Sequence, residues 1–219
     1  KTDGNGNGEW SQTFGGIGYE TGWSIQQTAD GGYIVCGVTS SFGNGNGDVY
    51  LIKTDGNGNE EWNQTFGGEY GDTGYSVKQT TDGGYIVCGK TNLGGETSYI
   101  MLIKTDEDGE EEWSQTFGGE YDDTGYSVQQ TTDGGYIIAG EKWSFGVGAQ
   151  SDVYLIKTDG NGNEEWNHAF DGIGYDVGWS IQQTTDGGYI ITGSTANWSN
   201  DCGDVYLIKT DGSGNEEWS

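Results

Sequence analysis

Few residues in this chain have the types and spacing that catalysis requires. The one histidine, His168, stands at a position where other copies of an internal repeat carry glutamine, such as Gln64 and Gln115. No Ser-His-Asp order and no nucleophile motif accompany it. With 35 acidic residues, carboxylate pairs follow from composition alone and say nothing about glycosidase geometry. We therefore predict that the chain is not an enzyme and has no catalytic residues.

The cysteines predict packing rather than metal binding. Cys36 and Cys88 share one position of the repeat, where Ala139 and Thr192 stand in the other copies, so a small buried side chain is expected there. Cys202 lies in a loop and is interpreted as a free thiol, with a bridge between two chains as the alternative. An odd count without Cys-x-x-Cys gives no zinc site, and no cofactor is predicted.

One type of acidic loop could bind a metal ion. The segment Asp55-Gly56-Asn57-Gly58-Asn59 spaces oxygen ligands at alternate positions, as calcium loops do. An EF-hand loop would need glutamate at its twelfth position, where Phe66 stands. A hairpin turn requires the same residue types. We expect a turn here, with weak calcium binding as the alternative, and assign no metal ligand.

Aromatic residues in four variable loops are the candidate ligand-binding residues. These loops span residues 39–47, 91–97, 142–151 and 194–203. They carry Phe42, Trp143, Phe145 and Trp198. Loops on a rigid scaffold often hold binding residues, and aromatic platforms beside carboxylates and amides suit sugar rings. Two sequons, at Asn63 and Asn197, are candidate N-glycosylation sites in a host that glycosylates.

The composition excludes several classes of protein. A formal charge of −27, with 8 lysines and no arginine, argues against nucleic acid as a partner. No run approaches the roughly 18 apolar residues of a transmembrane helix, so no membrane insertion is expected. The 9 tryptophans, 14 tyrosines and 6 phenylalanines supply a core in spite of the charge.

Because Lys1 lies partway through a repeat, we expect a mature product or a fragment of a longer precursor.

All of the candidate residues named above belong to an internal repeat of about 52 residues. Lys-Thr-Asp recurs at Lys1, Lys53, Lys104, Lys157 and Lys209. We predict a single domain over residues 1–219, with repeat units 1–52, 53–103, 104–156 and 157–208 and a partial unit 209–219. Each complete unit has four short stretches rich in β-branched and aromatic residues, which predict strands. In the second unit they cover residues 75–80, 85–88, 98–103 and 112–117.

Turn residues join the four stretches into an antiparallel meander. Asp-Gly-Gly-Tyr follows the first stretch and Thr-Asp-Gly-Asn-Gly-Asn follows the third. The second and third stretches are apolar on both faces, so each needs a neighbouring sheet on either side. Ser24, Gln26 and Thr28 of the first stretch suit a strand that lines a narrow, partly wet channel. Radial stacking of four-stranded blades meets these needs better than a β-solenoid or a β-sandwich, so we predict an all-β fold, a four-bladed β-propeller.

The repeat also resembles a known type. The pattern Asp-Gly-Gly-Tyr-Ile-x-x-Gly, Asp-Val-Tyr-Leu-Ile-Lys-Thr-Asp, Gly-Asn-x-x-Trp and Phe-Gly-Gly is similar to propeller repeats of secreted and surface proteins of bacteria and archaea. The resemblance covers essentially the whole chain and implies an extracellular or cell-surface, non-catalytic module. We predict a structural or interaction module, with a lectin that binds glycans through the variable loops, or a self-assembling surface component, as alternatives. Its predicted partners are a second copy of itself, other surface proteins and glycans.

The fourth stretch of the repeat occurs once more than the others. Its five copies are marked by Trp10, Trp62, Trp113, Trp166 and Trp218. Two of these copies compete for one place, beside the third strand of the last complete repeat. They are the first copy, residues 9–14 from Glu9 to Phe14, and the truncated last copy at Trp218. We predict that residues 9–14 close the ring of four blades. The alternatives are further blades, or exchange of this strand between chains to give a dimer or a polymer.

Overall fold

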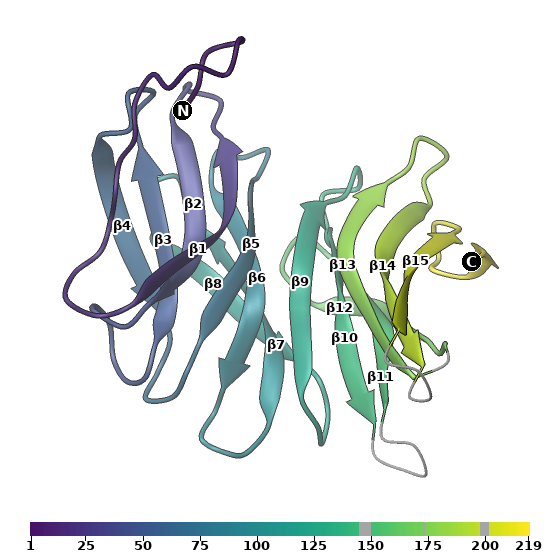
Figure 1. The fold of residues 1–219 in the computed structure, drawn as a ribbon. Coiled ribbons are helices and arrows are strands. Elements are labelled where there is room, and N and C mark those ends of the chain that lie inside the picture. Colours follow the sequence, from purple (N-terminus) through teal and green to yellow (C-terminus); the bar gives the residue numbers. More distant parts are fainter. Residues whose placement is uncertain (145–149, 173, 198–201) are drawn as a thin grey trace.

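The computed structural model describes residues 1–144, 150–172, 174–197 and 202–219, with the side chains of Asn197 and Cys202 left out. The described residues form sixteen β-strands in four antiparallel sheets of four strands each, and every sheet follows the order of the chain (Figure 1). This confirms the predicted all-β class and the four-stranded meander. Over the described residues, no helix has the length and apolar character needed to cross a membrane.

The four sheets are numbered in chain order. Sheet 1 contains β1 (Glu20–Gln27), β2 (Tyr33–Thr39), β3 (Asp48–Thr54) and β4 (Glu60–Phe66). Sheet 2 contains β5 (Thr73–Gln79), β6 (Tyr85–Asn92), β7 (Ser98–Thr105) and β8 (Glu111–Phe117). Sheet 3 contains β9 (Asp123–Gln130), β10 (Tyr136–Ser144), β11 (Gln150–Thr158) and β12 (Glu164–Phe170). Sheet 4 contains β13 (Tyr175–Gln183), β14 (Tyr189–Asn197), β15 (Cys202–Thr210) and β16 (Glu216–Trp218).

The turn between the first two strands of each sheet depends on glycine. In sheet 1 the N–H of Gly31 donates to the carbonyl of Thr28, and the φ of Gly31 is 88°. The turns of the other sheets place Gly83, Gly134 and Gly187 in the same region, at φ of 95°, 89° and 87°. A side chain is strained at such angles, which is why Asp-Gly-Gly recurs at these turns.

Over the part of the chain that the structure describes, the hydrophobic core consists of three clusters, one between each pair of neighbouring sheets. Ile34, Cys36 and Leu51 of sheet 1 pack against Val77 and Val87 of sheet 2, and all five are 0% exposed. The clusters between sheets 2 and 3 and between sheets 3 and 4 are built from the same repeat positions. The second and third strands of the inner sheets are therefore buried on both faces, as predicted.

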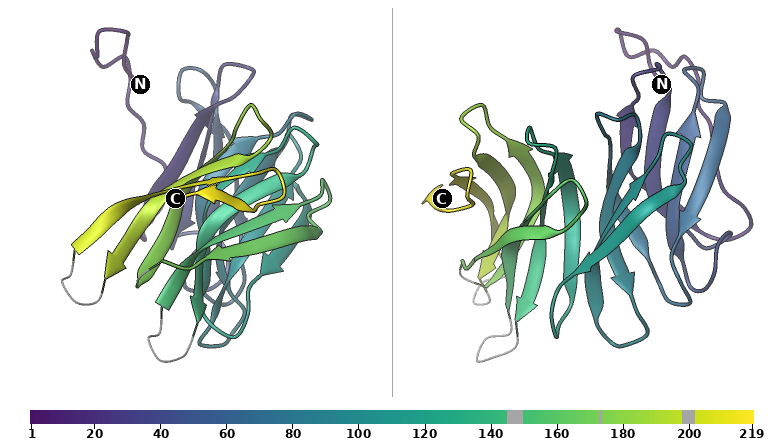
Figure 2. Two further views of the ribbon diagram at one scale, coloured as in Figure 1. Left: turned by 90° about the vertical axis from the view of Figure 1, so that its right-hand side faces the viewer. Right: turned by 180° about the vertical axis from the view of Figure 1, so that it is seen from behind.

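The sheets stand side by side in chain order, and sheets 1 and 4 lie at opposite ends of the row (Figures 1 and 2). The predicted closing strand is not in its expected place, because β15 pairs with β16 at Lys209 and Thr210. Residues 9–14 lie beside sheet 1, at the other end of the row, and are not assigned to a strand. The predicted ring closure by residues 9–14 is thus not present in this structure.

Candidate functional site

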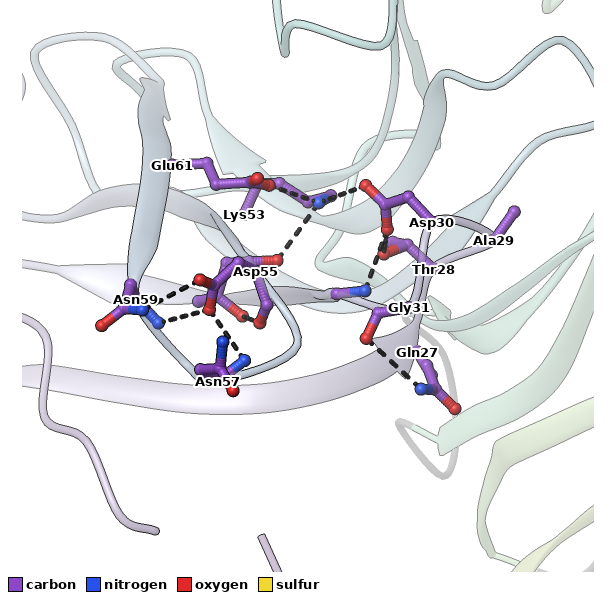
Figure 3. Close-up of polar contacts among 12 residues, drawn as sticks. Gln27, Thr28, Ala29, Asp30, Gly31, Lys53, Asp55, Asn57, Asn59 and Glu61 are labelled. Atoms are coloured by element: carbon purple, nitrogen blue, oxygen red, sulfur yellow. Dashed lines mark hydrogen bonds and ion pairs between the residues drawn. The ribbon is translucent and has the colours of Figure 1, made fainter.

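At the end of each sheet where the β-hairpin turns lie, a buried lysine is held between two carboxylates. In sheet 1, Lys53 Nζ lies 2.8 Å from Asp30 Oδ2 and 2.6 Å from Glu61 Oε2 (Figure 3). The same ammonium donates to the carbonyl of Thr54. Asp30 comes from the β1–β2 turn and Glu61 from β4, so the lysine of β3 joins both neighbouring strands. Burial alone would lower the pKa of Lys53, but its hydrogen bonds to the two carboxylates raise it.

The other sheets repeat this arrangement around Lys104, Lys157 and Lys209. In sheet 3, burial would raise the pKa of Asp133, but hydrogen bonds from Thr131, from the N–H of Gly135 and from Lys157 lower it to about 2. Each of these lysines is satisfied by its own sheet, including the carbonyl of the next residue. Each lysine with its two carboxylates is therefore a structural clamp that joins the first turn of its sheet to the fourth strand.

The acidic loops are closed turns. In the β3–β4 turn, Asp55 Oδ1 accepts the N–H groups of Asn57 and Asn59 at 2.8 and 2.9 Å, and Asp55 Oδ2 accepts Asn59 Nδ2 at 2.9 Å (Figure 3). These bonds lower the pKa of Asp55, with the Asn59 side chain as the largest cause. Over the described part of the chain, no group of three potential metal ligands gathers. Weak calcium binding at these turns stays a prediction.

The histidine and two of the cysteines belong to the packing. The His168 ring lies 5.3 Å from the ring of Trp166 between centroids, and its Nε2 is 3.1 Å from the carbonyl oxygen of Ser213. Cys36 and Cys88 are free and fully buried between sheets. Burial raises the pKa of the Cys36 thiol to about 12. The side chain of Cys202 lies outside the described residues.

A β-bulge interrupts the first strand of every sheet at the same place. In sheet 1 the register passes from Gly22 opposite Gly37 to Ser24 opposite Cys36, which leaves Trp23 without a partner. The bulged residues of the other sheets are Tyr75, Tyr126 and Trp179. A bulge re-aims the side chain of its extra residue, so each sheet contributes one aromatic ring outside the strand's normal alternation.

These four rings form a continuous line, which we call the aromatic row. The centroid distances along it are 5.6 Å from Trp23 to Tyr75, 5.3 Å from Tyr75 to Tyr126 and 4.5 Å from Tyr126 to Trp179. The rings are tilted by 46° to 63° to one another and line a hollow of about 510 Å³. Trp23 and Trp179 are 56% and 50% exposed. The row is thus an open apolar surface made of rigid side chains.

Polar groups accompany the row on the second strands. The hydroxyl of Tyr126 donates to Glu141 Oε1 at 2.7 Å, and Trp179 Nε1 donates to Ser194 Oγ at 3.1 Å. Burial and the nearby carboxylate of Glu141 raise the pKa of Tyr126. This site was not among those predicted from the sequence, although Gly-Trp-Ser or Gly-Tyr-Ser recurs in all four repeats. A bulge cannot be recognised from alternation alone, and this repeated triplet was the available signal.

Of the predicted loop residues, the structure describes Phe42 and Trp143, and it does not bring these two together. Phe42 is 44% exposed and packs on Tyr50 of its own sheet, with centroids 5.7 Å apart. Trp143 lies in β10 of sheet 3 and packs 5.4 Å from the ring of Tyr175. Sheet 2 stands between these two positions. Phe145 and Trp198 lie outside the described residues.

The remaining predicted residues have these places. Asn63 is exposed in β4, and its Nδ2 donates to Glu60 Oε1. Asn197 ends β14, and its side chain is outside the described part. Trp10 and Phe14 lie against sheet 1, whereas Trp218 is 50% exposed in β16. Use of the two sequons stays a prediction.

Comparison with known proteins gives little similarity. No family model and no curated protein matches this sequence. A solved structure that resembles it is the "Tail fiber of Staphylococcus aureus phage P68", with 12% sequence identity and a TM-score of 0.33. The match covers 89% of this chain and 50% of the other, so this chain spans about half the length of that structure.

Proposed function

We propose that this chain is a non-catalytic structural and interaction module, built from propeller-type blades, that binds glycan chains along the aromatic row. The observation that carries the proposal is the row itself. Four repeats use the same bulged position to set an aromatic ring beside the next one, and two tryptophans of the row are half exposed. Core packing between the sheets does not need an exposed ring at this position.

The packing of the strands supports propeller-type blades. The first strands β1, β5, β9 and β13 lie against one another in chain order. Hydrogen bonds link them, since Ser24 Oγ accepts the N–H of Val77 and Gln26 Oε1 accepts the N–H of Gln79. Farther from the first strands, apolar clusters fill the space between neighbouring sheets, with most of their residues on the second and third strands. Contact between the first strands of successive sheets is what propeller-type blades require, so this packing supports the proposal.

The use of the charged groups supports a non-catalytic role. The buried lysines, the turn aspartates and His168 direct their hydrogen bonds to groups of the fold itself. Asp72, directly before β5, and Asp123 and Asp176, in β9 and β13, each accept a backbone N–H group from the preceding loop. These contacts hold turns and loops in place.

Glycans are the ligand class that fits the row best. A sugar ring has an apolar face that lies on tryptophan or tyrosine, and hydroxyl groups that need hydrogen-bonding partners. The carboxylate of Glu141 and the hydroxyl of Ser194 lie within hydrogen-bonding distance of rings of the row, so both kinds of contact are near each other. The resemblance of the repeat to those of secreted and surface proteins favours an extracellular location, where such chains occur.

The experiment is isothermal titration calorimetry with a panel of soluble hexasaccharides of glucose, N-acetylglucosamine, mannose and xylose. We expect at least one of them to bind. Trp23→Ala or Trp179→Ala should then weaken binding by about tenfold, because one aromatic platform contributes about 1 kcal/mol or more. Tyr19→Ala is the matched control, since Tyr19 is 88% exposed and lies outside the row.

Two results would contradict the proposal. One is the absence of binding to every member of the panel at millimolar concentration. The other is binding that Trp23→Ala and Trp179→Ala leave unchanged while Phe42→Ala or Trp143→Ala removes it. The second result would place the glycan on the variable loops instead.

A further inference from the structure

The two ends of the row of sheets expose residues that are buried everywhere else. In β15 of sheet 4, Val205 is 84% exposed and Leu207 is 43% exposed. The same two positions are 0% exposed in the other sheets: Val49 and Leu51, Ile100 and Leu102, Val153 and Leu155. Each of those pairs is covered by the next sheet of the row. The outer face of sheet 4 therefore has the surface of an interface without the sheet that would cover it.

Sheet 1 presents the complementary surface at the other end. Ile25 is 64% exposed, whereas its counterparts Val77, Val128 and Ile181 are at most 7% exposed against the preceding sheet. Gly22 is next to a matching recess. A Cβ on Gly74 or Gly125 would lie 2.3 or 2.4 Å from the Sγ of Cys36 or Cys88, but on Gly22 the nearest atom is 3.7 Å away. The recess at Gly22 is thus free to accept a small side chain from another sheet.

The counterpart of those small side chains in sheet 4 is Thr192, which is exposed. It stands opposite Leu207, just as Cys36 stands opposite Leu51. The outer face of sheet 4 and the free face of sheet 1 therefore match as neighbouring sheets within the chain do. They also lie at opposite ends of the same molecule (Figure 1).

The outer edge of β15 is also incomplete. In sheet 1, β3 pairs with β4 along its length, from Val49 opposite Phe66 to Thr54 opposite Glu60. In sheet 4, β15 pairs with β16 only at Lys209 and Thr210. Within the described residues, its stretch 205–208 has no strand on that side. Free strand edges accept pairing from another chain.

Residues 1–14 have the form of the strand that this edge lacks. Trp10 lies 5.8 Å from Tyr33 between ring centroids, as Trp62 lies 5.7 Å from Tyr85. Lys1 pairs with Glu9 at 2.6 Å, which repeats the lysine–glutamate pair of the sheets. Phe14 helps to line a hollow of about 190 Å³ on the free face of sheet 1. The segment thus occupies the place of a fourth strand that belongs to a sheet preceding sheet 1.

We propose that the occupant of both end faces is a second copy of this chain. Sheet 4 of one copy packs on sheet 1 of the next, and residues 9–14 of the second copy pair with β15 of the first and take the place of β16. In the register of sheet 1, Val205 then stands opposite Phe14 and Leu207 opposite Gln12. The contact joins unlike faces, so it gives a closed ring if the rotation between copies closes, and an open row if it does not.

Light scattering after size exclusion tests this assembly. The chain would be examined from about 10 µM to about 1 mM in about 1 M salt, where the Debye length of about 3 Å screens its charge of −27. We expect masses at integer multiples of 23.5 kDa that grow with concentration. Ile25→Lys and Leu207→Lys should each reduce association by more than tenfold. Circular dichroism and thermal melting of each variant check that it folds, which the exposure of both positions favours.

Mixing the two variants gives the decisive measurement. Each variant keeps one intact face, so an equimolar mixture should form a 1:1 pair of about twice 23.5 kDa, capped at both ends. A pairing of like faces could not be restored in this way. Trp10→Ala should weaken assembly and Trp218→Ala should not, because residues 9–14 replace β16. A mass of 23.5 kDa at every concentration, or a mixture that stays monomeric, would overturn the proposal. Glycan titration of the monomeric variants keeps the outcome separate from that of the aromatic row.

Discussion

The face between sheets 3 and 4 and the outer face of sheet 4 carry nearly the same residues in opposite surroundings. The sequence Val-Tyr-Leu-Ile-Lys-Thr is identical in β11 and β15. Leu155 of β11 is 0% exposed against sheet 4, whereas Leu207 of β15 is 43% exposed. The difference shows that the repeat specifies an interface between sheets, and that the neighbouring sheet decides whether a given copy is buried.

The largest effect is expected from truncating the two leucines. Leu155→Ala should lower the free energy of unfolding by about 2–5 kcal/mol, because it leaves a cavity in a closed cluster. Leu207→Ala should cost less than about 1 kcal/mol in the isolated chain, because water already reaches the side chain. Urea unfolding at low protein concentration measures both changes. Equal losses would mean that the outer face of sheet 4 is covered, as in a closed ring.

A second pair of variants adds one methyl group at each location. A Cβ at Gly125 would lie 2.4 Å from Cys88 Sγ and 3.0 Å from Ile100 Cγ2, so Gly125→Ala should destabilise the chain by about 1–3 kcal/mol. Gly22→Ala should change the stability by less than about 0.5 kcal/mol, because Val35 Cγ1 is 3.7 Å away. Thermal unfolding compares the two. Adding Cys88→Ala to Gly125→Ala should give a loss smaller than the sum of the single losses, since the clash is with the sulfur. Additive losses would argue against that contact.

The smallest effect is expected at the lysine–carboxylate clamps, which are alike in the inner sheets and the end sheets. The pKa of Asp133 is lowered to about 2, so its contribution is present above the ordinary value of 3.8 and is lost as the pH falls toward 2. Without solvent screening, a pKa shift of this size would add about 2.5 kcal/mol to the free energy of unfolding. Screening by water at this exposed carboxylate reduces that contribution to about 1 kcal/mol.

Urea unfolding of Asp133→Asn and of the unaltered chain between pH 7 and pH 2 measures that contribution. The difference between them should shrink as the pH falls below 4. Asp186→Asn, in the end sheet, should follow the same profile, because the pKa of Asp186 is also lowered to about 2, by a hydrogen bond from Thr184 first of all. Different profiles would show that the clamp depends on the position of the sheet in the row.

The strands could be predicted because each carries its own local signals. In the second repeat, the expected stretches 75–80, 85–88, 98–103 and 112–117 fall on β5 to β8, and each observed strand is longer or shifted by a few residues at most. The turns follow from Asp-Gly-Gly, where Gly83 takes a φ of 95°. Burial of the second and third strands on both faces follows from their continuous apolar sequence.

The ring closure and the aromatic row could not be predicted, because both depend on geometry that the sequence pattern does not contain. Whether residues 9–14 reach β15 of the same chain depends on the rotation between sheets. Ser24 and Gln26, expected along a wet channel, accept the backbone N–H groups of Val77 and Gln79 in β5. The bulge at Trp23 sets an aromatic ring outside the alternation from which that expectation was drawn.

The most direct test of the account is the reactivity of a thiol placed on the outer face of sheet 4. The variant combines Thr192→Cys with Cys202→Ser, so that the introduced thiol occupies the position held by Cys36 and Cys88 in sheets 1 and 2. In the dilute chain, Ellman's reagent should modify the introduced thiol at the rate of an exposed cysteine. Cys36 and Cys88 should react only after unfolding, because both are 0% exposed. An introduced thiol as slow as Cys88, in a chain with a mass of 23.5 kDa, would contradict the account and show that the ends of the row meet within one molecule.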